Sequence, residues 1–441
     1  MRLSRLITWL IITCAFVLLF YRLGSRPLNS WDEAVYAESA KEMVQDGDWL
    51  TPHWNHEEFL QKPPLFIWSA ALLFKLFGVS EVSARAMSAL AGVGCVVLVL
   101  FIVRLFSAEF TAAIAALILL ATPSFKLNAR YAMTDVMLTF FMLLAIYAYL
   151  RTKENTKWWL LAGVSCGLAI MTKGAGAIPL FAALILVIAW KNRGAIRTQD
   201  FWLGVGLCLV IGGTWHLIML GLHGRTFIAD YFSSQVVSRT LQLVDSPEGR
   251  YGTFSYIPIL VLGFFPACLL LPLSISGWLK SRELPIILPV FAVTVLVLYS
   301  LSSTKHQWYI IPIFPILSIL AAPLSRKLIP LFVVAIVAGL IFSASNRPSK
   351  DTAAIAQLSH RASFDAGPLG FYPGLLHGPE ILFYSNRPLC ADAPEHSMGL
   401  LARCPLPEHV IIATDQIASF PHITELERSG NFAYCHAGWS R

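Results

Sequence analysis

The sequence predicts an all-α polytopic membrane protein with about eleven transmembrane helices and a small α/β domain at its C-terminal end. Hydrophobic residues make up 56% of the 441 residues and charged residues only 13%, whereas a soluble globular chain carries about 25% charged residues. Several apolar runs approach the roughly 20 residues that a helix needs to cross a bilayer. Together these observations exclude a soluble enzyme.

The first apolar run follows Met1-Arg2-Leu3-Ser4-Arg5 in the manner of a signal peptide, but no small-residue cleavage site follows it. We therefore expect it to remain as the first span. The predicted spans are 6–23, 86–103, 111–122, 135–150, 158–171, 177–190, 202–221, 256–274, 284–301, 310–324 and 328–344.

The basic residues form short clusters between the apolar runs, which the positive-inside rule assigns to cytoplasmic turns. The net charge of +7 therefore reflects membrane topology. Nucleic acid is not expected as a partner, because the basic residues do not form one patch interleaved with aromatic residues. With the N-terminus inside, the outer segments are 24–85, 123–134, 222–255, 302–309 and the chain from about 345 onward. The predicted sidedness depends most on the short spans 111–122 and 158–171. If either one does not cross the membrane, every later segment lies on the opposite side.

Two domains follow from this map: residues 1–344 form the transmembrane domain, which includes the first outer loop, and residues 345–441 form a small outer domain. Short apolar runs at 369–372, 410–413 and 432–434 alternate with helix-like stretches and predict an α/β fold.

Of the eight cysteines, Cys390, Cys404 and Cys435 lie in this domain. A Cys390–Cys404 disulfide and three free thiols are both open alternatives.

The first outer loop, residues 24–85, carries the strongest local signals. Ser30 and Glu33 have the spacing of a capping box, which predicts a helix start, and Gly47 predicts its end. Apolar residues fall on one face, as in a helix lying on the membrane surface. Further along, Lys62 precedes Pro63 and Pro64, which hold a cation in an extended turn before the next apolar helix.

Asp32 and Tyr36 lie one helical turn apart and share a face. Acidic residues in a first turn commonly do no more than stabilise the helix dipole. The rest of the loop favours a functional role for Asp32 instead. It places Trp31-Asp32-Glu33, Gly47-Asp48-Trp49 and Lys62 on one side of the membrane.

These motifs resemble the membrane glycosyltransferases of the GT-C class, in particular the bacterial aminoarabinose transferases that modify lipid A and, more distantly, the protein O-mannosyltransferases. The resemblance covers roughly the first 325 residues in order and spacing. It rests on Trp31-Asp32-Glu33-Ala34-Val35-Tyr36-Ala37, Gly47-Asp48-Trp49, Lys62-Pro63-Pro64, Gly78, Arg85, Arg130-Tyr131, Thr134-Asp135, Thr172-Lys173-Gly174, Ser303-Thr304-Lys305 and Tyr309-Ile310.

The resemblance implies a GT-C fold that moves a sugar from a polyprenyl-phosphate donor to a lipid or glycan acceptor such as lipid A, in the bacterial inner membrane with the active site facing the periplasm. Asp32 is then the general base, with Glu33 and Asp135 as further catalytic candidates. The predicted substrate-binding residues are Tyr36, Lys62, Arg85, Arg130, Tyr131, Lys173, Lys305, His306 and Tyr309.

Several roles stay open. Asp135 either takes part in the chemistry or stabilises the N-terminus of its span, and Lys173 either contacts phosphate or extends to the membrane surface. His306 is either a second phosphate donor or an ordinary loop residue. Metal binding is unknown: Gln61 stands where related transferases carry an acidic residue, and a divalent cation between Asp32 and Asp135 is a weakly supported alternative.

Four other classes compete with this interpretation. A protein O-glycosyltransferase and a ligase or polymerase that uses pyrophosphate-linked donors would show similar charges. A transporter of a lipid-linked substrate usually shows internal repeats and ionisable groups near the midplane, and only His216 fits that description. A scaffold has no need for cations and carboxylates concentrated on one side of the membrane.

Overall fold

The computed structural model of the chain describes residues 2–29, 32–238, 254–281, 283–302, 304–323, 329–345, 350–365, 369–371, 379–387, 389–391, 409–414 and 423–437. These residues form two compact units. Unit 1 comprises Met1–Tyr21, Leu60–Phe66 and Ala86–Ala344, and unit 2 comprises Arg22–Phe59, Ile67–Arg85 and Ser345–Arg441. The division into functional domains at residue 344 stays a prediction.

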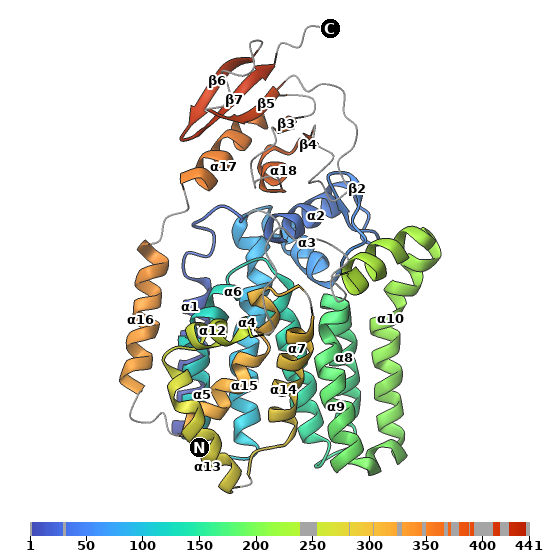
Figure 1. The fold of residues 1–441 in the computed structure, drawn as a ribbon, viewed down its shortest axis with the longest axis vertical. Coiled ribbons are helices and arrows are strands. Elements are labelled where there is room, and N and C mark those ends of the chain that lie inside the picture. Colours follow the sequence, from blue (N-terminus) through green and yellow to red (C-terminus); the bar gives the residue numbers. More distant parts are fainter. Residues whose placement is uncertain are drawn as a thin grey trace. The chain divides into compact units, whose positions relative to one another are not determined.

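Unit 1 is helical throughout its described residues (Figure 1). Helix α8 packs on both α7 and α10, while α9 packs on α14 and α15 on α5. The longer helices are α1 (Arg2–Phe20), α4 (Glu81–Arg104), α5 (Glu109–Ala121), α7 (Thr134–Arg151), α8 (Trp158–Lys173), α9 (Ile178–Lys191), α10 (Gln199–Phe227), α13 (Leu271–Ser281), α14 (Ile287–Leu301) and α16 (Ile329–Ser345). The shorter ones are α6 (Pro123–Asn128), α12 (Tyr256–Gly263), α15 (Ile313–Ala321), η1 (Gly174–Ala177), η2 (Arg193–Arg197), η3 (Ile228–Ser238), η4 (Ala267–Leu270) and η5 (Gln307–Ile310).

Small residues allow α8 and α10 to approach closely. A Cβ atom on Gly163 would lie 1.9 Å from the carbonyl oxygen of Gly204, and one on Gly204 would lie 2.3 Å from that of Trp159. Glycine is therefore required at both positions, as is common where transmembrane helices touch. This contact lies near the start of α8, whereas Lys173 lies in its last turn.

Four helical stretches among the described residues are long and apolar enough to cross a membrane: Glu81–Arg104, Thr134–Arg151, Trp158–Lys191 and Gln199–Ser233. Tyr256–Gly263 and Ala267–Trp278, bent by 103°, add a fifth if they form one span. The predicted integral multi-pass membrane protein is confirmed. The spans predicted at 158–171 and 177–190 meet in one stretch interrupted at Gly174, and the total of eleven spans stays a prediction.

Within unit 2, the helix predicted in the first loop is confirmed as α2 (Asp32–Asp46), and it ends at Gly47 with a φ of 75°. Ser30, its predicted cap, lies outside the described residues. The expectation of an amphipathic helix lying on the membrane surface does not fit α2, because every residue from Glu33 to Met43 is buried. One reason is that α18 (Pro379–Ser385) packs on α2, where the Lys41 ammonium pairs with Glu38 at 2.9 Å and donates to the carbonyl oxygens of Leu382 and Phe383.

A short hairpin and a second helix complete this loop. The hairpin strands β1 (His53–Trp54) and β2 (Glu57–Glu58) pair antiparallel, and they turn at Asn55 and His56, whose φ angles are 56° and 62°. Positive φ at both central residues is the geometry of a tight two-residue hairpin turn. Helix α3 (Leu65–Phe77) follows the two prolines, as predicted.

The predicted small α/β fold at the C-terminal end is confirmed by a five-stranded sheet. Its order is β4 (Leu389–Ala391), β3 (Leu369–Phe371), β5 (His409–Ala413), β7 (Phe432–Ala437) and β6 (Ile423–Ser429), with β3 parallel to both neighbours and the last two pairings antiparallel. Helix α17 (Lys350–Ala362) packs on β5, β6 and β7 through buried Ile355 and Leu358. Cys404 lies outside the described residues, so the predicted disulfide stays untested, whereas Cys435 is a buried free thiol in β7.

Candidate functional site

A buried ion pair stands at the centre of the candidate site in unit 1. Asp135 lies in the first turn of α7 and Lys173 in the last turn of α8, and the Lys173 Nζ atom donates to Asp135 Oδ1 at 2.5 Å. Their side chains are only 3% and 12% exposed. Two charges buried this deeply must compensate one another, since removing either leaves an unpaired charge. The structure therefore gives Asp135 a defined partner, which holds the Lys173 ammonium.

Aromatic side chains from α14 and the segment that follows it lie beside this pair. The Lys173 ammonium lies 5.0 Å from the centre of the Tyr309 ring, in cation–π contact. The Tyr309 ring lies 5.3 Å from Tyr299 and 5.1 Å from His306, and His306 in turn stacks on Trp308 at 4.5 Å. The residues predicted from the sequence at 173, 306 and 309 thus meet in space.

Lys305 contributes a second cation from the same segment. Its side chain is largely buried, and its ammonium donates to the carbonyl oxygen of Ser302 at 2.7 Å. A lysine ammonium carries three N–H donors, so this bond leaves capacity for an anionic ligand. The hydroxyl of Tyr256 donates to the carbonyl oxygen of His306 at 3.3 Å and so connects α12 to this segment.

The turn after α8 brings the predicted lysine–proline motif beside this region. Gly174 has a φ of 45°, and a Cβ atom there would lie 1.8 Å from the Tyr231 hydroxyl and 3.7 Å from Pro63 Cγ. The segment of Lys62, Pro63 and Pro64 therefore lies against the end of α8. Because Pro63 and Pro64 restrict the backbone, they limit the positions that the Lys62 side chain can reach.

Tyr231 is a site residue that the sequence reasoning missed. His216 Nδ1 lies 2.7 Å from the Gly212 carbonyl oxygen, which can only accept, so Nδ1 carries the proton and Nε2 accepts from the Tyr231 hydroxyl at 2.9 Å. The polar His216 inside a predicted span was the available signal. Tyr231 itself reaches it because the chain breaks at Gly224, where φ is 48°.

Arg130 donates to backbone oxygens, and its predicted role in substrate binding stays a prediction. Its guanidinium donates to the carbonyl oxygens of Leu18 at 2.9 Å, Leu19 at 3.0 Å and Tyr21 at 2.8 Å. Leu18 and Leu19 lie in the last turn of α1 and Tyr21 follows its end, where orphan acceptors and the negative dipole end favour a cation. The neighbouring Tyr131 is half-buried in the same turn.

Unit 2 holds the remaining predicted residues. Arg85 pairs with Glu33 at 2.7 Å, with both side chains less than 5% exposed, and also donates to the carbonyl oxygens of Leu23, Arg26 and Pro27. Glu33 additionally accepts from the Asn29 backbone N–H at 2.8 Å. This network positions the chain that enters α2, and the predicted roles of Glu33 in catalysis and of Arg85 in substrate binding stay predictions.

The other two predicted residues of unit 2 lie on α2 itself. Asp32 is half-buried in the first turn, and Tyr36 is buried one turn later at 2% exposure. Asp32 is therefore the less enclosed of the two residues.

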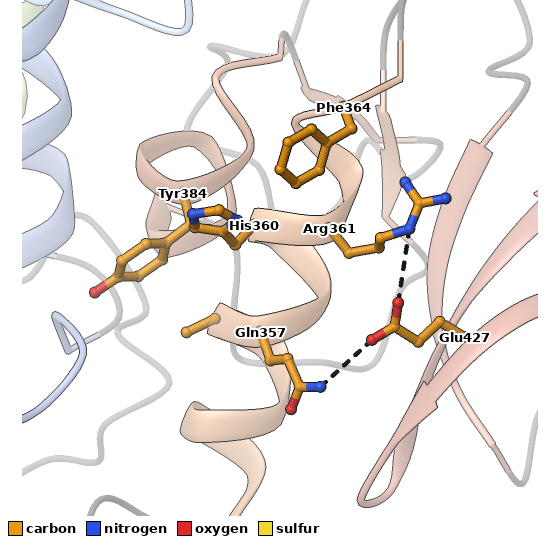
Figure 2. Close-up of a pocket in the computed structure, with 7 residues that line it drawn as sticks. Gln357, His360, Arg361, Phe364, Tyr384 and Glu427 are labelled. Carbon is orange, nitrogen blue, oxygen red and sulfur yellow. Dashed lines mark hydrogen bonds and ion pairs between the residues drawn. The ribbon is translucent and has the colours of Figure 1, made fainter.

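A separate hollow of about 450 Å³ lies on the C-terminal part of unit 2 (Figure 2). It is lined by Gln357, His360, Arg361, Phe364 and Glu427, among others. Glu427 accepts from Gln357 at 3.3 Å and pairs with Arg361 at 3.7 Å, and Arg361 also pairs with Asp365. Within this lining, the charges of Arg361 and Glu427 therefore compensate each other.

Comparison with known proteins agrees with the sequence motifs. Residues 9–220 match the family model of dolichyl-phosphate-mannose-protein mannosyltransferases. An uncharacterized protein from Aquifex aeolicus is 31% identical over 322 residues, which is 71% of this chain and 62% of that protein. An undecaprenyl phosphate-alpha-4-amino-4-deoxy-L-arabinose arabinosyl transferase from Pectobacterium carotovorum is 30% identical over 335 residues, 73% of this chain and 59% of that protein. The chain thus spans about three-fifths of the length of these relatives.

The fold is also similar to a solved structure. The crystal structure of ArnT from Cupriavidus metallidurans bound to undecaprenyl phosphate superposes with a TM-score of 0.81 over 97% of both chains, at 20% sequence identity. At that identity the likeness concerns the fold. Together, these comparisons confirm the resemblance to GT-C membrane glycosyltransferases that the sequence motifs predict.

Proposed function

Starting from its resemblance to the GT-C membrane glycosyltransferases, we propose that this chain transfers a sugar from a polyprenyl-phosphate donor to an acceptor at the outer face of a bacterial inner membrane. The observation that carries the proposal is the gathering of lysines and aromatic rings at the end of α8, within a helical membrane unit. Polyprenyl phosphate itself is bound in the similar ArnT crystal structure, which supports this class of donor.

The donor phosphate binds the ammonium groups of Lys62 and Lys305 in this proposal. Lysine is a point charge that pairs well with phosphate, and such charge-assisted hydrogen bonds are about twice as strong as neutral ones. Lys173 pairs with Asp135, and its positive charge adds to the electrostatic attraction for the phosphate. The ring of Tyr309 lies over Lys173 and limits access of water to the pair.

The acceptor hydroxyl gives its proton to Asp32 as it attacks the anomeric carbon of the donor sugar. The bond between that carbon and the phosphate oxygen breaks, and the polyprenyl phosphate leaves with its negative charge stabilised by the lysines. Asp135 acts as a positioning residue, since it holds Lys173.

The placement of the site follows from the predicted topology of eleven spans with the N-terminus inside. It puts Asp32, Lys62 and Lys305 on the periplasmic side, where nucleotide sugars are not available. The acceptor class we favour is lipid A or another envelope glycan, which agrees with the aminoarabinose transferases among the relatives. Protein O-glycosylation is the second candidate, and the family model that matches residues 9–220 favours it.

Mass spectrometry of lipid A tests this proposal in cells that carry the gene, lack it, or carry the Asp32→Asn variant. We expect an added sugar mass with the gene and none in the other two strains. If lipid A is unchanged but envelope proteins lose a hexose or pentose in the deletion strain, the protein O-glycosylation candidate is correct. Lipid A, other glycans and proteins that are all unchanged would contradict glycosyl transfer altogether.

A further inference from the structure

Three metal-ligating side chains converge in unit 2, and none of them belongs to the proposed glycosyl-transfer site. Glu42 and Asp46 lie one turn apart on α2, and His56 lies in the turn of the β1–β2 hairpin. One ligand atom from each of the three lies within 4.8 Å of the other two. We propose that Glu42, Asp46 and His56 form a binding site for a divalent transition-metal ion, with Zn²⁺ the ion that best fits the donors.

The buried carboxylate of Glu42 is the independent observation that points to a cation. Glu42 is only 1% exposed, and its Oε2 atom accepts from the backbone N–H of His56 at 3.1 Å. Its other oxygen, Oε1, is buried and has no hydrogen-bond partner among the described residues. A buried carboxylate oxygen without a donor is costly, and a bound cation would satisfy it.

The negative charges around Glu42 also favour a bound cation. Two carboxylates at positions i and i+4 of a helix repel each other, and Glu38 adds a third carboxylate one turn before Glu42. The Lys41 ammonium is held at Glu38 and at two carbonyl oxygens of α18, so its hydrogen bonds are spent there. A divalent ion between Glu42 and Asp46 would turn this repulsion into attraction.

The chemistry of the ligands selects the ion. Two carboxylate oxygens and one imidazole nitrogen suit Zn²⁺, whereas Mg²⁺ and Ca²⁺ take oxygen ligands. Around a tetrahedral Zn²⁺ the ligand atoms lie about 3.4 Å apart, given bonds of about 2.1 Å. In the structure the three ligand atoms lie within 4.8 Å of one another. Asp46 and His56 are both exposed, so their side chains can rotate toward Glu42 and shorten these distances to those around a bound ion.

The consequence of binding is structural. The ion would join the hairpin turn to the last turn of α2 and hold the loop that leads to Lys62. This role is separate from the proposed glycosyl transfer, because none of the three residues belongs to that site, and it is measured without a sugar donor.

The test is a calorimetric titration of the full chain with Zn²⁺. The chain is purified in detergent without a histidine tag and stripped with a chelator beforehand. We expect one Zn²⁺ per chain that is lost or weakened about tenfold or more in Asp46→Asn and in His56→Gln, since even outer ligand partners change affinity by about 10–100-fold. Both side chains are exposed, so these variants remove no buried contact.

Glu57→Gln, a carboxylate of the same hairpin, and His360→Gln, an exposed histidine of α17, serve as matched controls and should bind like the wild type. A second readout is the thermal unfolding midpoint, which Zn²⁺ should raise in the wild type and controls but not in the two ligand variants. Zn²⁺ affinity that is unchanged in both ligand variants, or a wild type that binds no Zn²⁺, would overturn the proposal.

Discussion

The ion pair of Asp135 and Lys173 gives a quantitative prediction for the variant Lys173→Met. Removing one partner of a buried pair costs about 3–5 kcal/mol, because the other charge stays buried. Asp135 lies at the N-terminus of α7, whose dipole offsets up to about 1 kcal/mol. Because the Lys173 side chain is 12% exposed, the pair is not fully dehydrated, and breaking it costs less than breaking a fully buried pair. We therefore expect Lys173→Met to destabilise the protein by about 2–3 kcal/mol.

Unfolding in mixed detergent micelles measures this loss in a double-mutant cycle. The double variant Lys173→Met with Asp135→Asn should regain about 1–2 kcal/mol over Lys173→Met alone, since no unpaired charge then remains. Lys191→Met is the matched control, because Lys191 is an exposed lysine at the end of α9 that lies over the Trp190 ring. A Lys173→Met variant as stable as the control, or a double variant less stable than both single variants, would refute the reasoning.

Three further predictions follow from the site and the topology. Asp32→Asn should keep donor binding but lower turnover by roughly 10²-fold or more in a transfer assay, and near-normal turnover in a properly inserted variant would exclude it as the base. Gly174→Ala should destabilise by about 2 kcal/mol or more in thermal unfolding, because its φ is positive and a tyrosine hydroxyl occupies the space, whereas Gly213→Ala, which meets nothing, should be neutral. A periplasm-active reporter should work when fused after Arg441 and fail near Asn192, and the reverse pattern would invert the predicted map.

Local sequence signals predicted the elements that short-range chemistry determines. The acidic first turn and Gly47 delimited α2, and the apolar runs near 369, 410 and 432 became strands of one sheet. The sequence could not predict that α2 would be buried on all sides. That burial depends on α18, more than 300 residues further along the chain, whose carbonyl oxygens accept from Lys41.

In the candidate site, too, the sequence identified single residues but not the partners that they contact in the fold. The sequence singled out Asp135, Lys173 and Tyr309 separately and left the role of Lys173 open. Only the packing of α7 on α8 shows that Lys173 pairs with Asp135 across 38 positions in the chain. Likewise, the segment of Arg130 does not reveal that its guanidinium donates to three carbonyl oxygens at the end of α1, more than 100 residues earlier in the chain.

The central claim is that lysines from two separate segments of unit 1 bind the phosphate of a polyprenyl-phosphate donor. Its most direct test is a titration of the purified chain with undecaprenyl phosphate. Each charge-assisted bond is worth about 1.5–3 kcal/mol, so Lys62→Ala and Lys305→Ala should each weaken the affinity by about tenfold or more, while Lys191→Ala should leave it unchanged. Wild-type affinity in both Lys62→Ala and Lys305→Ala would contradict the account.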